Sequence, residues 1–349
     1  MQVSICNSFQ LDPVRNYNSN FEIKRIYLSI ILAEIFKAYN LTDRKLDLFF
    51  VDNQFSNHLC LDLKELKSIL NDKFDEINLY SDNPLDCRTG EFKIIRSEDV
   101  FEEDQNFVAS TRKSKLECSA PTYKFGVCIQ RPDQHRLSLL VGLADLNELD
   151  LFSKIGFDKH TLNVIDYWRQ SCGDQVLRKY NLSYGQFCDK LENFTRSDLT
   201  DFMNPCFESH SLNNVAHNQT CLNYCLDIAC ESTVGDEIFI PSEKVLRPMM
   251  LKQPFIVFSS QYFYKNLHKL GFKTFDSLWD ESWDKFDQYW MFEKTKHIVN
   301  TVKDINGRYT IDQLLEYTKE IREHNYLRCV ELYTNTDEWD KAMQGIVNG

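Results

Sequence analysis

Short apolar runs alternate with longer amphipathic segments along most of this chain. In the first third, apolar runs at 46–51, 76–80 and 91–95 are typical of buried strands, and segments 21–39 and 61–74 repeat apolar residues at helical spacing. Strands that alternate with helices pair in parallel through right-handed crossovers. The pattern therefore predicts an α/β protein.

The alternation resumes after a polar stretch at 97–119, which we interpret as a linker. Strands are predicted at 123–129, 222–229 and 254–259, and helices at 132–149, 241–252, 261–270 and 310–330. Segment 158–204 is expected to be a mostly helical insertion in the second block. We therefore expect two Rossmann-like lobes, one at 1–120 and one at 121–330, followed by a C-terminal tail at 331–349.

The charge balance excludes some classes of partner. The chain has 40 basic and 52 acidic residues, a formal net charge of −12, so it lacks the basic surface of a nucleic-acid binder or of a protein held on an anionic membrane. It has no apolar run of about 18 residues that would span a bilayer and no secretory signal. We expect a cytoplasmic protein whose 12 cysteines are reduced thiols.

Several common cofactor and metal motifs are missing. There is no Walker A loop, no G-x-G-x-x-G, no H-E-x-x-H and no D-x-D carboxylate clamp. Cys221, Cys225 and Cys230 lie close together, but no further cysteine or histidine completes a zinc pattern, so we expect thiols along a buried strand. The sequence predicts neither a bound cofactor nor a metal.

The segment 222–248 carries the most chemistry. An apolar run ends at Glu231, and after a short loop Ser242 is a candidate N-cap, or Pro241 a first-turn residue, for a helix that begins with Glu243 and Lys244. Backbone N–H groups and the positive end of a helix dipole attract phosphate, and a lysine adds a point charge. Carboxylates beside them can accept hydrogen bonds from sugar hydroxyls.

This segment resembles the donor-binding core of GT-B glycosyltransferases, in particular the fucosyltransferase-like signature, with Ser242 where that pattern has threonine. It also resembles uncharacterised glycosyltransferases encoded by phages and large DNA viruses. The motifs that carry the resemblance, in chain order, are Gln130–Leu137, Glu231 with Phe239–Lys244, Gln253–Val257, Leu270–Asp276 and Trp279–Asp284. It covers about residues 121–290, and the first 120 residues match only as a generic α/β lobe.

The resemblance implies a role for each matching residue. Glu243 and Lys244 would grip the ribose and diphosphate of a nucleotide-sugar, Glu231 would face the transferred sugar, and Arg131 and Arg136 would bind phosphate. The second lobe would then bind the donor, and the first lobe would bind a glycan or protein-linked glycan acceptor. Transfer would need no metal, because protein cations would stabilise the leaving diphosphate.

A catalytic base is expected from the first lobe if transfer inverts configuration. Asp52 and Asp82 each follow a predicted strand, and either is a candidate base; the alternative is a turn-forming aspartate. The oligomeric state stays open. The competing functions are a catalytically inactive nucleotide- or glycan-binding protein of the same fold and an unrelated two-lobed interaction protein.

Two features in the last third have structural interpretations. Asp276, Asp280 and Asp284 are spaced to share one solvated helix face. The aromatic residues Trp290 and Phe292, and the stretch 262–264, are expected in the core rather than on a sugar-binding platform.

Overall fold

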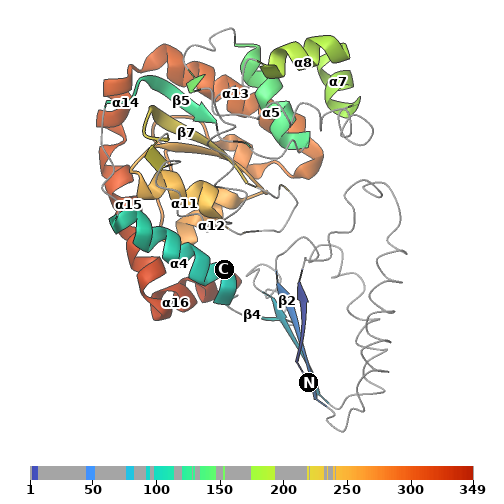
Figure 1. Ribbon diagram of the computed structural model, residues 1–349, viewed down its shortest axis with the longest axis vertical. Coiled ribbons are helices and arrows are strands. Elements are labelled where there is room, and N and C mark those ends of the chain that lie inside the picture. The colour runs from blue at the N-terminus through green and yellow to red at the C-terminus, as the bar shows by residue number, and fades with distance from the viewer. Residues whose placement is uncertain are drawn as a thin grey trace. The chain divides into compact units, whose positions relative to one another are not determined.

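The computed structural model describes residues 2–6, 45–51, 76–81, 92–94, 98–113, 120–127, 129, 134–146, 152–153, 174–192, 218–219, 221–231, 234, 239 and 241–348 (Figure 1). The chain divides into two compact units. Unit 1 is Met1–Ser97 with Val347–Gly349, and unit 2 is Glu98–Ile346. The division after Ser97 lies upstream of the boundary at 120 that the sequence suggested.

Unit 1 contains a four-stranded parallel sheet in the order β1-β2-β3-β4. Its strands are β1 Gln2–Cys6, β2 Lys45–Val51, β3 Glu76–Ser81 and β4 Phe92–Ile94. Three of the four were predicted, and β1 was not. The helices predicted at 21–39 and 61–74 lie outside the described residues.

Unit 2 contains a second parallel sheet, in the order β6-β5-β7-β8. Its strands are β5 Tyr123–Val127, β6 Phe152–Ser153, β7 Tyr224–Cys230 and β8 Phe255–Phe258. β7 is buried along its whole length, which explains why it reads as a continuous apolar run. At Gly126 a Cβ atom would lie 2.3 Å from the Tyr224 ring, so only glycine lets that ring pack against β5.

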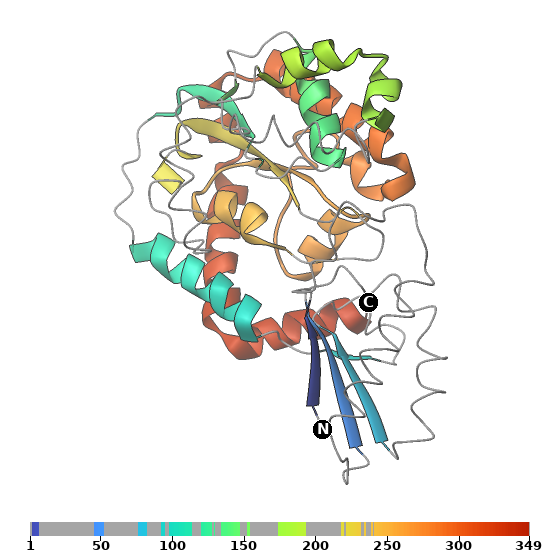
Figure 2. The same ribbon diagram turned by 45° about the vertical axis from the view of Figure 1, so that its right-hand side comes forward.

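Helices cover this sheet in two groups (Figures 1 and 2). α5 Gln134–Ala144 packs with α13 Met291–Arg308, and α7 Asp174–Tyr180 and α8 Tyr184–Glu192 pack on α5. The other group is α4 Glu98–Lys113, α11 Glu243–Met250 and α15 Lys319–Thr334. α5 lies between β5 and β6 in the chain, and α11 lies between β7 and β8. These two connections run toward opposite edges of the sheet, so right-handed crossovers place α5 and α11 on opposite faces. The two-lobed GT-B-like class of the whole chain stays a prediction.

The prediction of a linker at 97–119 is wrong for most of its length, because Glu98–Lys113 form α4, a helix of unit 2. Its buried residues Asp104, Phe107, Val108 and Thr111 form one helical stripe, and the helix packs against α11 and α15. Because Asp104 and Thr111 are polar, this buried stripe does not stand out in the sequence as an apolar helical pattern.

The C-terminal region is more helical and more divided than expected. The predicted helix 310–330 is two helices, α14 Ile311–Tyr317 and α15, and the capping box between Thr310 and Gln313 is confirmed. The predicted tail 331–349 contains the end of α15 and a further helix, α16 Thr336–Asn348.

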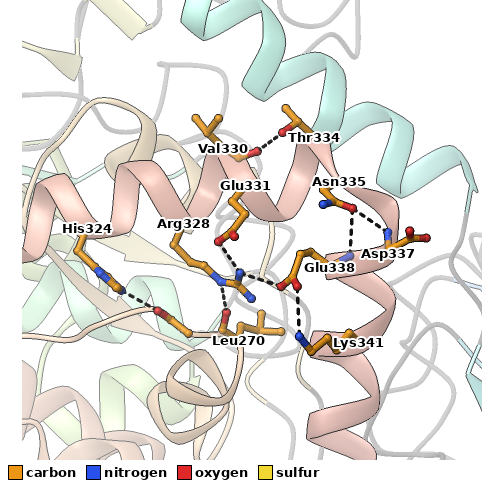
Figure 3. Close-up of polar contacts among 11 residues, drawn as sticks. Leu270, His324, Arg328, Val330, Glu331, Thr334, Asn335, Asp337, Glu338 and Lys341 are labelled. Atoms are coloured by element: carbon orange, nitrogen blue, oxygen red, sulfur yellow. Dashed lines mark hydrogen bonds and ion pairs between the residues drawn. The ribbon is translucent and has the colours of Figure 1, made fainter.

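Figure 3 shows the polar contacts of the α15–α16 junction, by which we mean Arg328, Glu331, Asn335, Glu338 and Lys341. Arg328 Nη1 lies 2.7 Å from Glu331 Oε2 and 3.2 Å from Glu338 Oε2, and its Nε donates to the Leu270 carbonyl. The Asn335 side chain accepts from backbone N–H groups in the first turn of α16. These contacts join the two helices to the turn that follows α12, Phe263–Lys269.

The segment after α12 is not the helix that the aspartate spacing suggested. It contains two short 3₁₀ turns, η4 Ser282–Lys285 and η5 Gln288–Trp290. Asp284 does not lie on a solvated face with its neighbours, since its carboxylate accepts from the backbone N–H groups of Tyr264 and Lys265 at the start of α12.

Candidate functional site

The order of strands in unit 2 marks the place where a ligand would bind. β5 is the first strand; the chain continues to β6 on one side of it and to β7 on the other. In parallel sheets ligands commonly bind outside the carboxyl ends of the two strands at such a reversal, here β5 and β7. Glu231 directly follows β7, and α5 begins shortly after β5, so the predicted donor residues lie at this edge.

Glu231 is the centre of the site. The residue is 3% exposed, and Ser242 donates two hydrogen bonds to its carboxylate, from the backbone N to Oε1 at 3.1 Å and from Oγ to Oε2 at 2.5 Å. Burial raises the pKa of the Glu231 carboxyl, and the positive charge of Lys244 and the Ser242 hydrogen bonds offset only part of that rise. The carboxylate therefore ties the end of β7 to the start of α11.

The start of α11 has the predicted N-cap, but one of the backbone N–H groups expected to bind phosphate is already hydrogen-bonded. Ser242 is the N-cap, as predicted, and its Oγ accepts from the Lys244 backbone N at 3.3 Å. The Ser242 N–H, however, is bound to Glu231 rather than left for a phosphate. An internal carboxylate thus occupies part of the anion position that the sequence assigned to a ligand.

Lys244 and Glu243 form an ion pair beside Glu231. Lys244 Nζ lies 2.6 Å from Glu243 Oε1, and both side chains are partly exposed, at 21% and 31%. Burial raises the pKa of the Glu243 carboxyl, but the charge and hydrogen bond of Lys244 outweigh this and leave the pKa below its ordinary value. The pair brings charged groups to the strand edge without adding net charge.

His135 and Arg136 support Glu231 from α5. The Glu231 carbonyl can only accept, so His135 Nε2 donates to it at 3.0 Å, and Arg136 Nη2 donates to it at 3.3 Å. Burial lowers the pKa of His135 to about 3, which keeps the imidazole neutral with its proton on Nε2. Arg136, predicted to bind phosphate, is 2% exposed and holds the backbone at the end of β7.

A buried ion pair fixes α11 on β7 below this edge. Asp227 in β7 is fully buried, its Oδ2 lies 3.1 Å from Arg247 Nη2, and the Tyr224 hydroxyl donates to the same oxygen. Arg247 lies one helical turn beyond Glu243, so this contact positions the first turn of α11 against Glu231.

Lys294 is a residue of this edge that the sequence analysis missed. It is 3% exposed, and its Nζ donates to the Ser259 carbonyl at 2.8 Å and to the Ser260 carbonyl at 3.3 Å, just beyond β8. It lies on the buried stripe of α13, which otherwise consists of Met291, Thr295, Ile298, Thr301, Val302 and Ile305. A lysine within such a stripe was the signal available in the sequence.

Three predicted site residues, Asp52, Asp82 and Arg131, lie outside the described residues. The described part of the chain contains no group of three His, Cys, Asp or Glu side chains that could hold a metal ion. Cys225 and Cys230 are free thiols in the buried strand β7, with Cys221 buried just before it, as predicted. Among the described helices, none is long and apolar enough to cross a membrane.

Comparison with known proteins adds no assignment. No family model, no curated protein and no solved structure matches this chain. The candidate site is therefore the strand-edge cluster, by which we mean Glu231, Ser242, Glu243 and Lys244, together with His135 and Arg136, which bind the Glu231 carbonyl.

Proposed function

We propose that this chain is a metal-independent glycosyltransferase that uses a nucleotide-sugar donor, bound by unit 2, and a glycan acceptor, with the cytoplasm as its compartment. One observation carries the proposal: the buried carboxylate of Glu231 is held by Ser242 at the start of α11, at the reversal point of a parallel sheet, with Glu243 and Lys244 next to it. Sites for phosphorylated sugars commonly combine helix N-termini, carboxylates and lysines at such edges.

The proposed roles follow from the charge that develops during transfer. Cleavage of the bond between the anomeric carbon and the diphosphate places negative charge on the leaving group, and Lys244 and Arg131 would stabilise it. Glu231 and Glu243 would accept hydrogen bonds from donor hydroxyls. An acceptor hydroxyl would attack the anomeric carbon and lose its proton to a base, for which Asp52 and Asp82 are the proposed candidates.

A second function is favoured by a specific observation. Glu243 compensates the charge of Lys244, and Glu231 occupies the Ser242 N–H, so these residues are well suited to bind hydroxyl groups but carry little positive charge for a departing diphosphate. This favours a nucleotide- or glycan-binding protein without catalytic activity as the alternative.

The proposal is tested by thermal unfolding of the chain with UDP-, GDP-, ADP- and CMP-sugars, with and without EDTA. We expect one nucleotide class to raise the melting temperature and EDTA to have no effect. Hydrolysis or transfer of the same donor then separates an enzyme from a binding protein.

Lys244→Ala should lose most donor binding, whereas Lys341→Ala should bind as the parent chain does. Lys341 is a matched control because it also lies near a glutamate, Glu338, but on α16. Full donor affinity and turnover in Lys244→Ala would rule out the assigned site.

A further inference from the structure

One side of β8 has no neighbouring strand among the described residues, because β8 ends the sheet order β6-β5-β7-β8. On its other side β8 pairs with β7, where the Asp227 N–H donates to the Pro254 carbonyl and the Glu231 N–H donates to the Phe258 carbonyl. Alternate residues of a strand direct their backbone groups to opposite sides, so the N–H and C=O of Val257 point away from β7. Outward groups of this kind are a template for pairing with another chain.

The sequence of β8 makes this edge prone to pairing. The strand reads Phe-Ile-Val-Phe, and all four residues are buried. No charged residue occurs from 253 to 261. Protected edge strands commonly contain a lysine or a proline, and β8 contains neither. An uncharged segment of aromatic and β-branched residues pairs readily with a copy of itself, so this edge needs protection from elsewhere.

Two side chains bind the outward groups of Val257. The Tyr264 hydroxyl oxygen accepts from the Val257 N–H at 2.8 Å, and the Trp283 indole N–H donates to the Val257 carbonyl at 3.2 Å. Tyr264 is 3% exposed and Trp283 is 1% exposed, and their ring centroids lie 5.9 Å apart at 64°. We call these two residues the edge cover. Both backbone groups that an added strand would use at Val257 are thus already paired.

Contacts between α12 and η4 hold the edge cover together. Tyr264 lies on α12 and Trp283 on η4. The Asp284 carboxylate accepts from the Tyr264 N–H at 2.8 Å and from the Lys265 N–H at 3.2 Å, and the Asp284 carbonyl accepts from the Tyr262 N–H at 2.6 Å. The two side chains therefore reach β8 from elements that are also bonded to each other.

Aromatic residues near the edge cover do not all belong to the core. Phe263 and Tyr264 are buried, as expected, whereas Tyr262 and Trp290 are 46% and 56% exposed, so the expectation of a core position is wrong for these two. Phe292 is partly exposed. Aromatic character alone therefore does not distinguish the rings that pack on the sheet from those that face solvent.

We propose that Tyr264 and Trp283 block strand addition at β8, and that the partner they exclude is a second copy of this chain. In an antiparallel pair, two residues directly opposite each other can exchange both of their backbone hydrogen bonds. Val257 of one copy, opposite Val257 of another, would satisfy the same two groups that the edge cover binds. The proposal rests on these contacts and does not depend on the proposed function.

The test removes the two hydrogen bonds in the full chain. Tyr264→Phe deletes the acceptor and keeps the ring, and Trp283→Leu deletes the donor and opens part of the edge. Sedimentation velocity over a range of concentrations measures self-association. We expect the double variant to associate about tenfold more tightly than the parent, because both freed groups gain partners in the other copy.

The matched control is Trp279→Leu. Trp279 is also buried, at 3% exposed, but its indole N–H has no hydrogen-bond partner within the part of the chain that the structure describes. The control therefore loses an indole of the same size without freeing a group of β8, and it should associate as the parent does. Association of the double variant no stronger than that of Trp279→Leu would overturn the proposal.

A proline locates the contact. Val257→Pro, added to the double variant, removes the outward N–H and breaks no hydrogen bond to β7, so it should return association to the parent level. Undiminished association with the proline present would show that the copies meet elsewhere, against the proposal.

Tyr264→Phe alone decides the question if the double variant does not fold. Its Val257 amide should exchange hydrogen about tenfold faster than in the parent, as measured by mass spectrometry, since the amide has lost its acceptor. Exchange at the parent rate would mean that the hydroxyl does not protect this edge.

Discussion

Glu231 and Glu338 show how differently two regions of unit 2 use a carboxylate. At the strand edge, Glu231 is buried and is held by a hydroxyl and a backbone amide, and burial raises its pKa. At the α15–α16 junction, Glu338 lies near the surface, and its hydrogen bonds to Arg328 and Lys341 lower its pKa. The junction pairs opposite charges to connect helices, whereas the strand edge keeps a carboxylate in a site that disfavours its charge. A stability cost of that kind is typical of functional sites.

The largest expected effect concerns the buried pair below the strand edge. Arg247→Ala should lower the free energy of unfolding by about 3–5 kcal/mol, because Asp227 stays buried without its cation. Urea unfolding measures this. Arg308→Ala is the matched control, since it breaks the exposed pair with Asp304 and should leave the midpoint almost unchanged. Equal shifts in the two variants would show that burial does not set the cost of removing the cation of an ion pair.

The next effect concerns Glu231 itself. Glu231→Ala leaves the Ser242 N–H without its acceptor and should lower the free energy of unfolding by about 1–3 kcal/mol, while Glu231→Gln, which keeps an acceptor, should lose less. Both variants should lose stabilisation by the donor. If Glu231→Ala unfolds at the parent midpoint, the carboxylate does not tie β7 to α11.

A third glutamate, Glu281, tests whether burial causes the difference between the raised pKa of Glu231 and the lowered pKa of Glu338. The pKa of Glu281 is raised to about 8, and burial is the largest cause. Hydrogen bonds from Thr274 and from the Phe275 backbone offset part of this rise, and the negative charges of Asp276 and Asp284 add to it. The folded chain therefore holds this proton more tightly than the unfolded chain. Its contribution to stability is present at low pH and is lost as the pH rises from about 4.5 to about 8.

Glu281→Gln should remove this decline from the pH dependence of the unfolding free energy. The measurement is urea unfolding at intervals from pH 4.5 to pH 8. A variant that declines as steeply as the parent would contradict the raised pKa.

The smallest effect is expected at the junction. Because the folded pKa of Glu338 is lowered, its contribution to stability is present above the unfolded pKa and is lost as the pH falls, the opposite sign to Glu281. Glu338→Gln should lower the melting temperature slightly at neutral pH, and 1 M salt should abolish the difference from the parent. A difference that persists in salt would assign Glu338 a packing role.

Helices and strands were predicted most accurately from the sequence where one local signal determines the structure. β7, α11 and β8 were placed to within about two residues, since an uninterrupted apolar run, a serine N-cap and a second apolar run each act locally. The capping box of α14 was found for the same reason. α4 was missed because two polar residues, Asp104 and Thr111, belong to its buried stripe.

Features that depend on tertiary contacts could not be predicted. The sequence predicted an anion position at the start of α11, but it did not predict that the carboxylate of Glu231, eleven residues before Ser242, would accept the Ser242 N–H. Likewise, Trp283 and Trp290 belong to similar aromatic and acidic stretches, and only the packing of η4 on β8 decides that the first is buried and the second exposed.

The thiols of β7 give this chain an internal reporter. Burial raises the pKa of both Cys225 and Cys230 to about 12, so at neutral pH neither is a nucleophile in the folded state. Iodoacetamide would alkylate them only in molecules whose central strand has opened. The rate of modification, followed by mass spectrometry, would therefore measure how often the sheet opens under native conditions, without any denaturant.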